Sequence, residues 1–127
     1  MLEFGERRLS TLRLAVVEDD ESFRESLEGL FVSLGYEVST YLTAEHFMQM
    51  GQLGDIDCLL TDYCLPGISG IDLLRATRAI WPHLPVIVMT ARNEPAILTR
   101  ALAEGAIRVF TKPVNTSELL KAINEVV

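Results

Sequence analysis

Short, mostly apolar segments alternate with longer amphipathic ones along nearly the whole chain, and this alternation is the strongest constraint on its fold. The apolar segments are residues 12–17, 36–41, 57–61, 85–89 and 107–110. Their length and the polar, glycine or proline residues around them predict strands. After each one, hydrophobic residues recur three or four positions apart, as at Phe23, Leu27 and Leu30, which is typical of one helix face. We therefore expect five strand–helix units.

Capping residues indicate where the predicted helices begin and end. Gly35 follows the first helical pattern and is expected to end that helix, while Asp20 is expected to cap its beginning. Thr43 is the predicted N-cap of a helix that runs to about Met50, and Asn115 or Thr116 caps the last helix.

The strand pattern also predicts how the sheet is built. Nearly continuous apolar strands are typical of a parallel sheet covered by helices on both faces. Right-handed connections leave few arrangements for five such units. We expect an α/β fold with a doubly wound five-stranded parallel sheet, (βα)5 and flavodoxin-like, in the strand order 2-1-3-4-5. Residues 12–127 form this domain, and residues 1–11 precede it as an N-terminal extension.

Composition excludes several classes of function for these 127 residues. The net charge of −7 disfavours direct binding to nucleic acid. No apolar run approaches the roughly 20 residues needed to span a bilayer, and residues 1–10 lack the apolar core of a signal peptide. Cys58 lies in an apolar run and is expected in the core, so the two cysteines do not suggest a disulfide scaffold. We expect a cytoplasmic protein without membrane contact.

Polar residues occur where the predicted strands end. Glu18, Asp19 and Asp20 follow the first strand and Asp62 the third. Ligands of open parallel sheets bind at the carboxyl ends of the strands, so these side chains are expected to converge. Neighbouring carboxylates favour a hard cation such as Mg²⁺. A carboxylate can also act as a nucleophile toward phosphorus.

Thr90 and Lys112 follow the fourth and fifth strands and complete this set. A hydroxyl and an ammonium group can stabilise the charge of a transferred phosphoryl group. Each residue alone has an ordinary explanation: Asp62 as a turn residue, Thr90 as a cap and Lys112 as a solvated surface lysine. Suitable chemistry at four strand ends together favours a phosphoryl-transfer site.

These motifs resemble the receiver domains of bacterial two-component response regulators. The matching segments are VVEDD at residues 16–20, LLTDYCLPGISG at 59–70, VIVMTA at 86–91, GA at 105–106 and FTKP at 110–113. The resemblance covers residues 12–127, and the combination of motifs is specific although no single one is.

The resemblance implies a role for each matched residue. Asp62 is the phosphoacceptor, and Glu18 and Asp19 bind Mg²⁺, for which Mn²⁺ or Ca²⁺ could substitute, with Asp19 the more direct ligand. Asp62 and the backbone carbonyl of Cys64 complete the metal site. Thr90 supplies the hydroxyl that moves to the phosphoryl group, and Lys112 pairs with the phosphoryl oxygens.

The sequence departs from the family pattern in two places. The position three residues before the lysine is usually aromatic and is Val109 here. Phe110 is adjacent but is expected to point to the opposite face of its strand. The thiol of Cys64 is an uncommon side chain at its position. The family also implies a cis bond between Lys112 and Pro113.

The resemblance further implies partners. A sensor histidine kinase would donate the phosphoryl group, and an effector domain outside this chain would give a transcriptional output. Phosphorylation would promote a homodimer through the helix at 94–103, the strand at 107–110 and the last helix. Among the apolar residues of the 94–103 helix, Leu98 and Leu102 cannot both join Ile97 and Ala101 on one narrow buried stripe. No independent enzymatic turnover is expected.

Three other classes of protein fit the sequence less well. A flavodoxin-type electron carrier would need a hydroxyl- and glycine-rich loop where Glu18, Asp19 and Asp20 stand. An aspartate-nucleophile phosphatase would need a second carboxylate two residues after the first, where Cys64 stands after Asp62. A receiver-like module that binds partners without phosphorylation would be expected to lack some of the site residues, and all of them are present.

Overall fold

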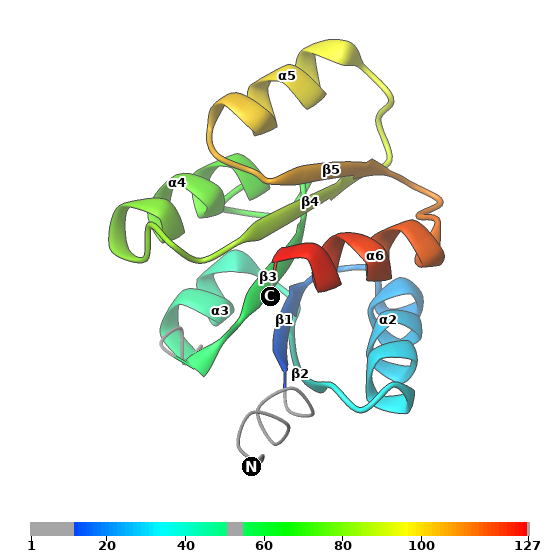
Figure 1. Cartoon of the computed structure of the whole chain (residues 1–127). Coiled ribbons are helices and arrows are strands. Elements are labelled where there is room, and N and C mark those ends of the chain that lie inside the picture. The colour runs from blue at the N-terminus through cyan, green and yellow to red at the C-terminus, as the bar shows by residue number, and fades with distance from the viewer. Residues whose placement is uncertain (1–11, 51–54, 127) are drawn as a thin grey trace.

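The computed structural model describes residues 12–50 and 55–126, so the predicted extension at 1–11 lies outside the described residues. Strands and helices alternate strictly along these residues (Figure 1). The strands are β1 (Arg13–Val17), β2 (Glu37–Tyr41), β3 (Cys58–Asp62), β4 (Val86–Thr90) and β5 (Arg108–Thr111). The helices are α2 (Glu21–Ser33), α3 (Ala44–Met50), α4 (Gly70–Ile80), α5 (Pro95–Ala103) and α6 (Thr116–Val126). None of the described helices is long and apolar enough to cross a bilayer.

The five strands form one parallel sheet in the order β2-β1-β3-β4-β5, which confirms the predicted flavodoxin-like topology. The pairing aligns the carboxyl ends, with Val17 beside Thr61 and Thr90 beside Thr111. β3 and β4 each extend one residue beyond the predicted end. Asp62 and Thr90 are therefore the last residues of their strands, held in the sheet, rather than the first residues of loops.

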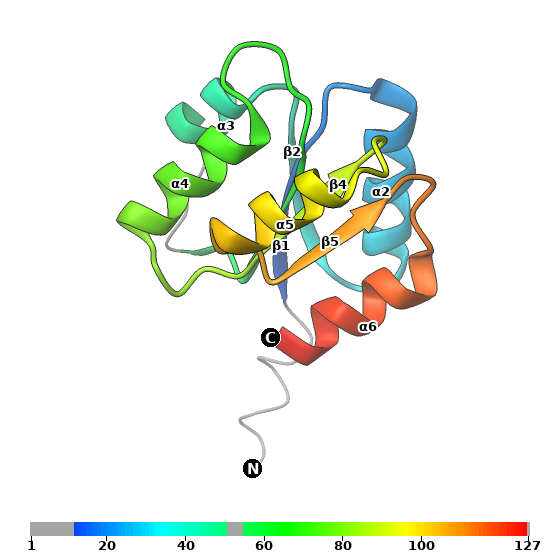
Figure 2. The same ribbon diagram turned by 90° about the horizontal axis from the view of Figure 1, so that it is seen from above.

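Helices cover the sheet on both faces, with α3, α4 and α5 on one and α2 and α6 on the other (Figures 1 and 2). Two hydrophobic clusters fill these layers, and β1 contributes alternate residues to each. Ala15 and Val17 belong to the cluster under α3, α4 and α5, whereas Leu14 and Val16 belong to the cluster under α2 and α6. The burial of both faces explains why the strands are nearly continuous apolar runs.

The helix ends follow the predicted capping pattern with one exception. The hydroxyl of Thr43 accepts a hydrogen bond from the His46 N–H at 3.0 Å, and Asn115 Oδ1 accepts one from the Glu118 N–H at 3.0 Å. Asp20 is the N-cap residue of α2, as predicted, but its side chain accepts no capping hydrogen bond. Instead, the N–H of Asp20 donates to Glu18 Oε2 at 3.1 Å, which ties this residue to the carboxyl end of β1.

Candidate functional site

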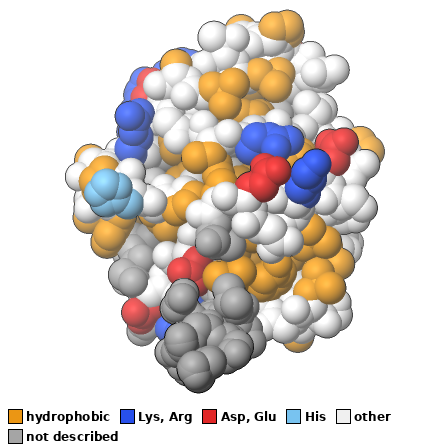
Figure 3. Space-filling view, viewed as in Figure 1, with side chains coloured by type: hydrophobic (Ala, Val, Ile, Leu, Met, Phe, Trp, Pro, Cys, Tyr) orange, Lys and Arg blue, Asp and Glu red, His pale blue; other side chains and the backbone are white. Residues whose placement is uncertain are grey.

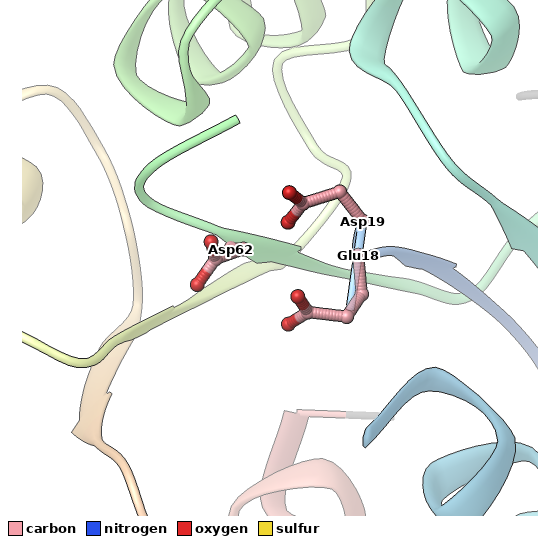
Figure 4. Close-up of side chains that lie close together, drawn as sticks. All are labelled: Glu18, Asp19 and Asp62. Carbon is pink, nitrogen blue, oxygen red and sulfur yellow. The ribbon is translucent and has the colours of Figure 1, made fainter. Parts of the chain in front are cut away.

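The acidic residues predicted at the strand ends come together in the structure. Glu18 directly follows β1, and its N–H donates to the carbonyl of Tyr41 at the end of β2, so the backbone continues the sheet. Asp62 ends the neighbouring strand β3. Glu18, Asp19 and Asp62 each place a carboxylate oxygen within 4.8 Å of the others (Figure 4). Glu18 and Asp62 are buried, whereas Asp19 is exposed at the mouth of the site.

Lys112 reaches the same site from the fifth strand. Its N–H donates to the carbonyl of Thr90 at 2.7 Å, which anchors the residue after β5 beside the end of β4. Its ammonium Nζ lies 2.8 Å from Glu18 Oε1 and 3.0 Å from Asp62 Oδ1. One lysine therefore bridges two buried carboxylates from different strands. The bond between Lys112 and Pro113 is cis, as expected.

The electrostatics of the site follow from three neighbouring carboxylates, two of which are paired with one ammonium group. Burial raises the pKa of the Glu18 carboxyl, and the Asp62 charge adds to this, although the hydrogen bond from Lys112 opposes it. Burial also raises the pKa of Asp62, with a further contribution from Asp19. For Lys112, burial acts to lower the pKa, but hydrogen bonds to Glu18 and Asp62 raise it above the ordinary value.

The donor set fits a hard divalent cation. All three converging groups offer carboxylate oxygens, the ligands that Mg²⁺ and Ca²⁺ prefer. Three carboxylates and one ammonium group leave a net negative charge at the site. A bound divalent cation would provide the missing compensation.

Thr90 lies at the same edge of the sheet, fully buried at the end of β4. Its hydroxyl accepts a hydrogen bond from the Arg92 N–H at 3.0 Å, so it is turned toward the loop before α5. Cys64 is exposed on the loop after β3. Its backbone role at the metal stays a prediction.

Val109, at the family's usual aromatic position, and its neighbour Phe110 point to opposite faces of β5. Val109 packs against the hydrophobic cluster under α3, α4 and α5, whereas Phe110 is buried in the cluster under α2 and α6. This confirms that Phe110 does not take the place of an aromatic ring at residue 109.

Two contacts at the site were not predicted from the sequence. The ring of Phe23 in α2 lies 4.7 Å from Lys112 Nζ, a cation–π distance. The carboxylate of Glu45 in α3 accepts a hydrogen bond from the N–H of Ile68, in the loop after Asp62. The helical spacing of Phe23 indicated only a core position, and Glu45 stands in a segment without any strand-end signal.

The fold and the site thus define a doubly wound α/β domain with a cluster of three carboxylates and a lysine at the carboxyl edge of its sheet. The family model described as the response regulator receiver domain matches residues 14–124. The chain belongs to the response regulator receiver domain family.

Known proteins similar to this chain agree with that assignment. The transcriptional regulatory protein FixJ of Azorhizobium caulinodans is 34% identical over 89% of this chain and 54% of its own length. Nodulation protein W of Bradyrhizobium diazoefficiens is 37% identical over 85% of this chain and 48% of its own. The chain thus spans about half the length of these relatives. A receiver domain structure from Clostridium thermocellum has a TM-score of 0.86 and 29% identity, covering 91% of this chain and 93% of that one.

Proposed function

We propose that this domain accepts a phosphoryl group on Asp62, from a histidine kinase or a small phosphodonor, in a Mg²⁺-dependent reaction. The observation that carries the proposal is the convergence of Glu18, Asp19 and Asp62 within 4.8 Å, with Lys112 bridging two of them. This arrangement of carboxylates and lysine supports phosphoryl transfer, because the reaction depends on positioning and on charge compensation around the reacting group.

In the proposed reaction, a carboxylate oxygen of Asp62 attacks phosphorus. A new O–P bond forms while the bond from phosphorus to the donor's histidine nitrogen, or to an acyl oxygen, breaks and leaves its electron pair on the donor. Glu18, Asp19, Asp62 and the Cys64 carbonyl would hold Mg²⁺, which when bound offsets the negative charge of the carboxylates and phosphoryl oxygens. Lys112, already 3.0 Å from Asp62 Oδ1, neutralises part of the charge on the phosphorylated side chain.

The proposed response runs through Thr90. Its hydroxyl would leave the Arg92 N–H and donate to a phosphoryl oxygen, and the loop that leads into α5 would follow. Since Val109 has no ring to rotate, this route depends on Thr90 and α5 without an aromatic partner.

The proposed output surface comprises α5, β5 and α6. Ile97 and Ala101 of α5 are buried, Leu98 is half-buried and Leu102 is exposed, so the helix carries more apolar surface than the core covers. Figure 3 shows hydrophobic side chains over α5 and charged side chains of both signs over α6. We propose that phosphorylation favours a homodimer through this surface.

The wider setting is also proposed from the family. The domain would act in the cytoplasm and control transcription through an effector domain outside this chain, with no contact between the receiver itself and DNA. Apart from its own phosphorylation, it would turn over no substrate.

Phosphorylation can be tested directly by mass spectrometry of the intact chain after incubation with acetyl phosphate and Mg²⁺. We expect a mass gain of one phosphoryl group that Asp62→Asn and EDTA both abolish. Asp57→Asn is the matched control, because Asp57 stands directly before β3, at the end of that strand opposite Asp62, and should leave the gain intact. No mass gain in the wild-type chain with acetyl phosphate or a kinase donor would favour a binding module that works without phosphorylation.

A further inference from the structure

Glu45 connects α3 to the loop that starts directly after the phosphoacceptor. It lies in the first turn of α3, and in Figure 2 the loop between β3 and α4 arches beside this helix. Glu45 Oε2 accepts a hydrogen bond from the Ile68 N–H at 3.2 Å. This contact joins residues 23 positions apart in the sequence.

The loop is shaped to receive this carboxylate. The same oxygen packs so closely on Gly67 that a Cβ at this position would collide with it. Gly67 also has a φ of 76°, a conformation that favours glycine. The absence of a side chain at Gly67 leaves room for the Glu45 carboxylate beside the loop backbone.

The contact is a poor way to stabilise the fold. Among the described residues, Glu45 Oε1 is buried without a hydrogen-bond partner. A buried polar atom without a partner lowers the stability of the folded chain. Thr43 already caps the beginning of α3, so Glu45 is not needed to start this helix. We therefore infer that the contact serves to fix the conformation of the loop after β3.

The ends of this loop are held independently of Glu45. The Tyr63 N–H donates to the carbonyl of Met89 at 2.7 Å, and the Gly70 N–H donates to the carbonyl of Tyr63 at 3.0 Å. Glu45 adds a fixed point at residues 67 and 68, between these ends. The segment between Tyr63 and Gly67 contains Cys64, whose carbonyl is the predicted fourth metal ligand.

We propose that Glu45 is a positioning residue that holds the loop at residues 63–69 in the geometry required for Mg²⁺ binding beside Asp62. This inference rests on the proposed function, since it assigns Glu45 a role at that same site. Mg²⁺ demands near-ideal octahedral coordination, so a loop free to shift by fractions of an ångström would bind it less tightly.

The test is calorimetric titration of the whole chain with Mg²⁺. Residues behind the direct ligands typically change metal affinity by ten- to a hundred-fold, so we expect Glu45→Ala to weaken binding by roughly tenfold. Glu45→Gln keeps a carbonyl acceptor for the Ile68 N–H and should stay within about twofold of wild type. Glu118→Ala removes the same side chain from the first turn of another helix, α6, and should change nothing.

A second readout separates positioning from a structural role. In EDTA, the urea midpoint of Glu45→Ala should equal or exceed that of wild type, because the unpaired Oε1 is removed and the exposed Ile68 N–H can bond to water. The initial rate with acetyl phosphate should fall at low Mg²⁺ and recover at saturating Mg²⁺.

The outcomes distinguish this inference from the proposed function. If wild type is phosphorylated and Glu45→Ala binds Mg²⁺ equally well, the role of Glu45 is refuted and the phosphoacceptor remains. If Glu45→Gln loses as much affinity as Glu45→Ala, the charge and not the hydrogen bond matters, and positioning is refuted. If wild type neither binds Mg²⁺ nor takes up phosphate, the proposed function fails first.

Discussion

Asp57 and Asp62 stand five residues apart around β3, and their surroundings give them different chemistry. Asp57, directly before the strand, is exposed and accepts a hydrogen bond from the Arg13 N–H at 2.9 Å. Asp62, the last residue of the strand, is 5% exposed and meets Lys112 and the other carboxylates of the site. The topology rule for strand ends predicted the place of Asp62, whereas Asp57, predicted inside the buried strand, stands before it and is exposed. The contact of one ammonium group with both Glu18 and Asp62 could not be predicted, because it depends on side-chain geometry and the hydrophobic periodicity of the sequence carries no information about that geometry.

The raised pKa values of Glu18 and Asp62 predict a particular pH dependence of stability. A carboxyl whose pKa is higher in the folded than in the unfolded chain contributes stability at low pH that is lost as the pH rises through the folded pKa. In EDTA, Asp62→Asn should therefore gain stability relative to wild type as the pH rises from about 4 to about 8. Urea unfolding of both chains measures this difference.

Saturating Mg²⁺ provides the control for that experiment. A cation bound by the ionised carboxylates stabilises the folded wild-type chain, and it does so more strongly at high pH. The difference in stability that favours Asp62→Asn over wild type at high pH should then shrink or change sign. A stability difference independent of pH, with and without Mg²⁺, would contradict the assigned pKa shifts.

The two cysteines should differ sharply in reactivity. Burial raises the pKa of the Cys58 thiol to about 12, whereas Cys64 is exposed on the loop beside the site. The thiolate is the reactive form, so iodoacetamide should modify Cys64 in the native protein and Cys58 only after unfolding. Peptide mass mapping after native and urea-treated labelling distinguishes the two sites, and native labelling of Cys58 would contradict its place in the core.

At the scale of the elements, sequence patterns predicted the identity of the strands and helices better than their ends. β5 is predicted at 107–110 and found at Arg108–Thr111, because hydrogen bonding in the sheet and not hydropathy decides where a strand ends. Asp20 stands at the predicted N-cap position of α2, but its side chain makes no capping hydrogen bond. Its N–H is engaged by Glu18, a partner that belongs to the site and not to the helix.

Two helix starts allow the energetic value of a cap to be measured. Ser69 accepts a hydrogen bond from the Asp72 N–H at 3.2 Å and caps α4, whereas the Asp20 side chain accepts none at the start of α2. Ser69→Ala should lower the free energy of unfolding by about 1 kcal/mol. Asp20→Ala should cost no more than roughly 0.5 kcal/mol, through the lost interaction with the helix dipole.

Urea unfolding in EDTA compares the two variants without interference from a metal ion. The test is whether Ser69→Ala loses more free energy of unfolding than Asp20→Ala does. An equal or larger loss for Asp20→Ala would mean that its side chain caps α2 in solution after all.

At the scale of the whole molecule, the acidic site and the proposed output surface lie on different parts of the sheet. The acidic pocket lies at the carboxyl edge of the sheet, between β1 and β3, whereas α5 and β5 lie at and beyond the β4 side. Thr90 ends β4 and therefore stands between the two regions. The sequence predicted that Thr90 lies at the carboxyl end of this strand, but not that its hydroxyl accepts a hydrogen bond from the Arg92 N–H. Under the proposed function, this contact would make the loop before α5 the first segment to respond.

The proposed dimer can be tested by replacing an exposed apolar residue on α5 and, as a control, one on α4. Leu102 of α5 is 50% exposed and Ile80 of α4 is 55% exposed, so both can be replaced by aspartate without burying a charge. With Mg²⁺ and beryllofluoride, a phosphoryl mimic, sedimentation velocity should show dimer formation by wild type and by Ile80→Asp. Leu102→Asp should stay monomeric, because two like charges would meet across a symmetric contact.

The Mg²⁺ affinity of Leu102→Asp should match that of wild type, which separates a lost interface from a damaged site. If the mimic leaves wild type monomeric, or if Leu102→Asp dimerises as well as Ile80→Asp, the output surface is not the one formed by α5, β5 and α6.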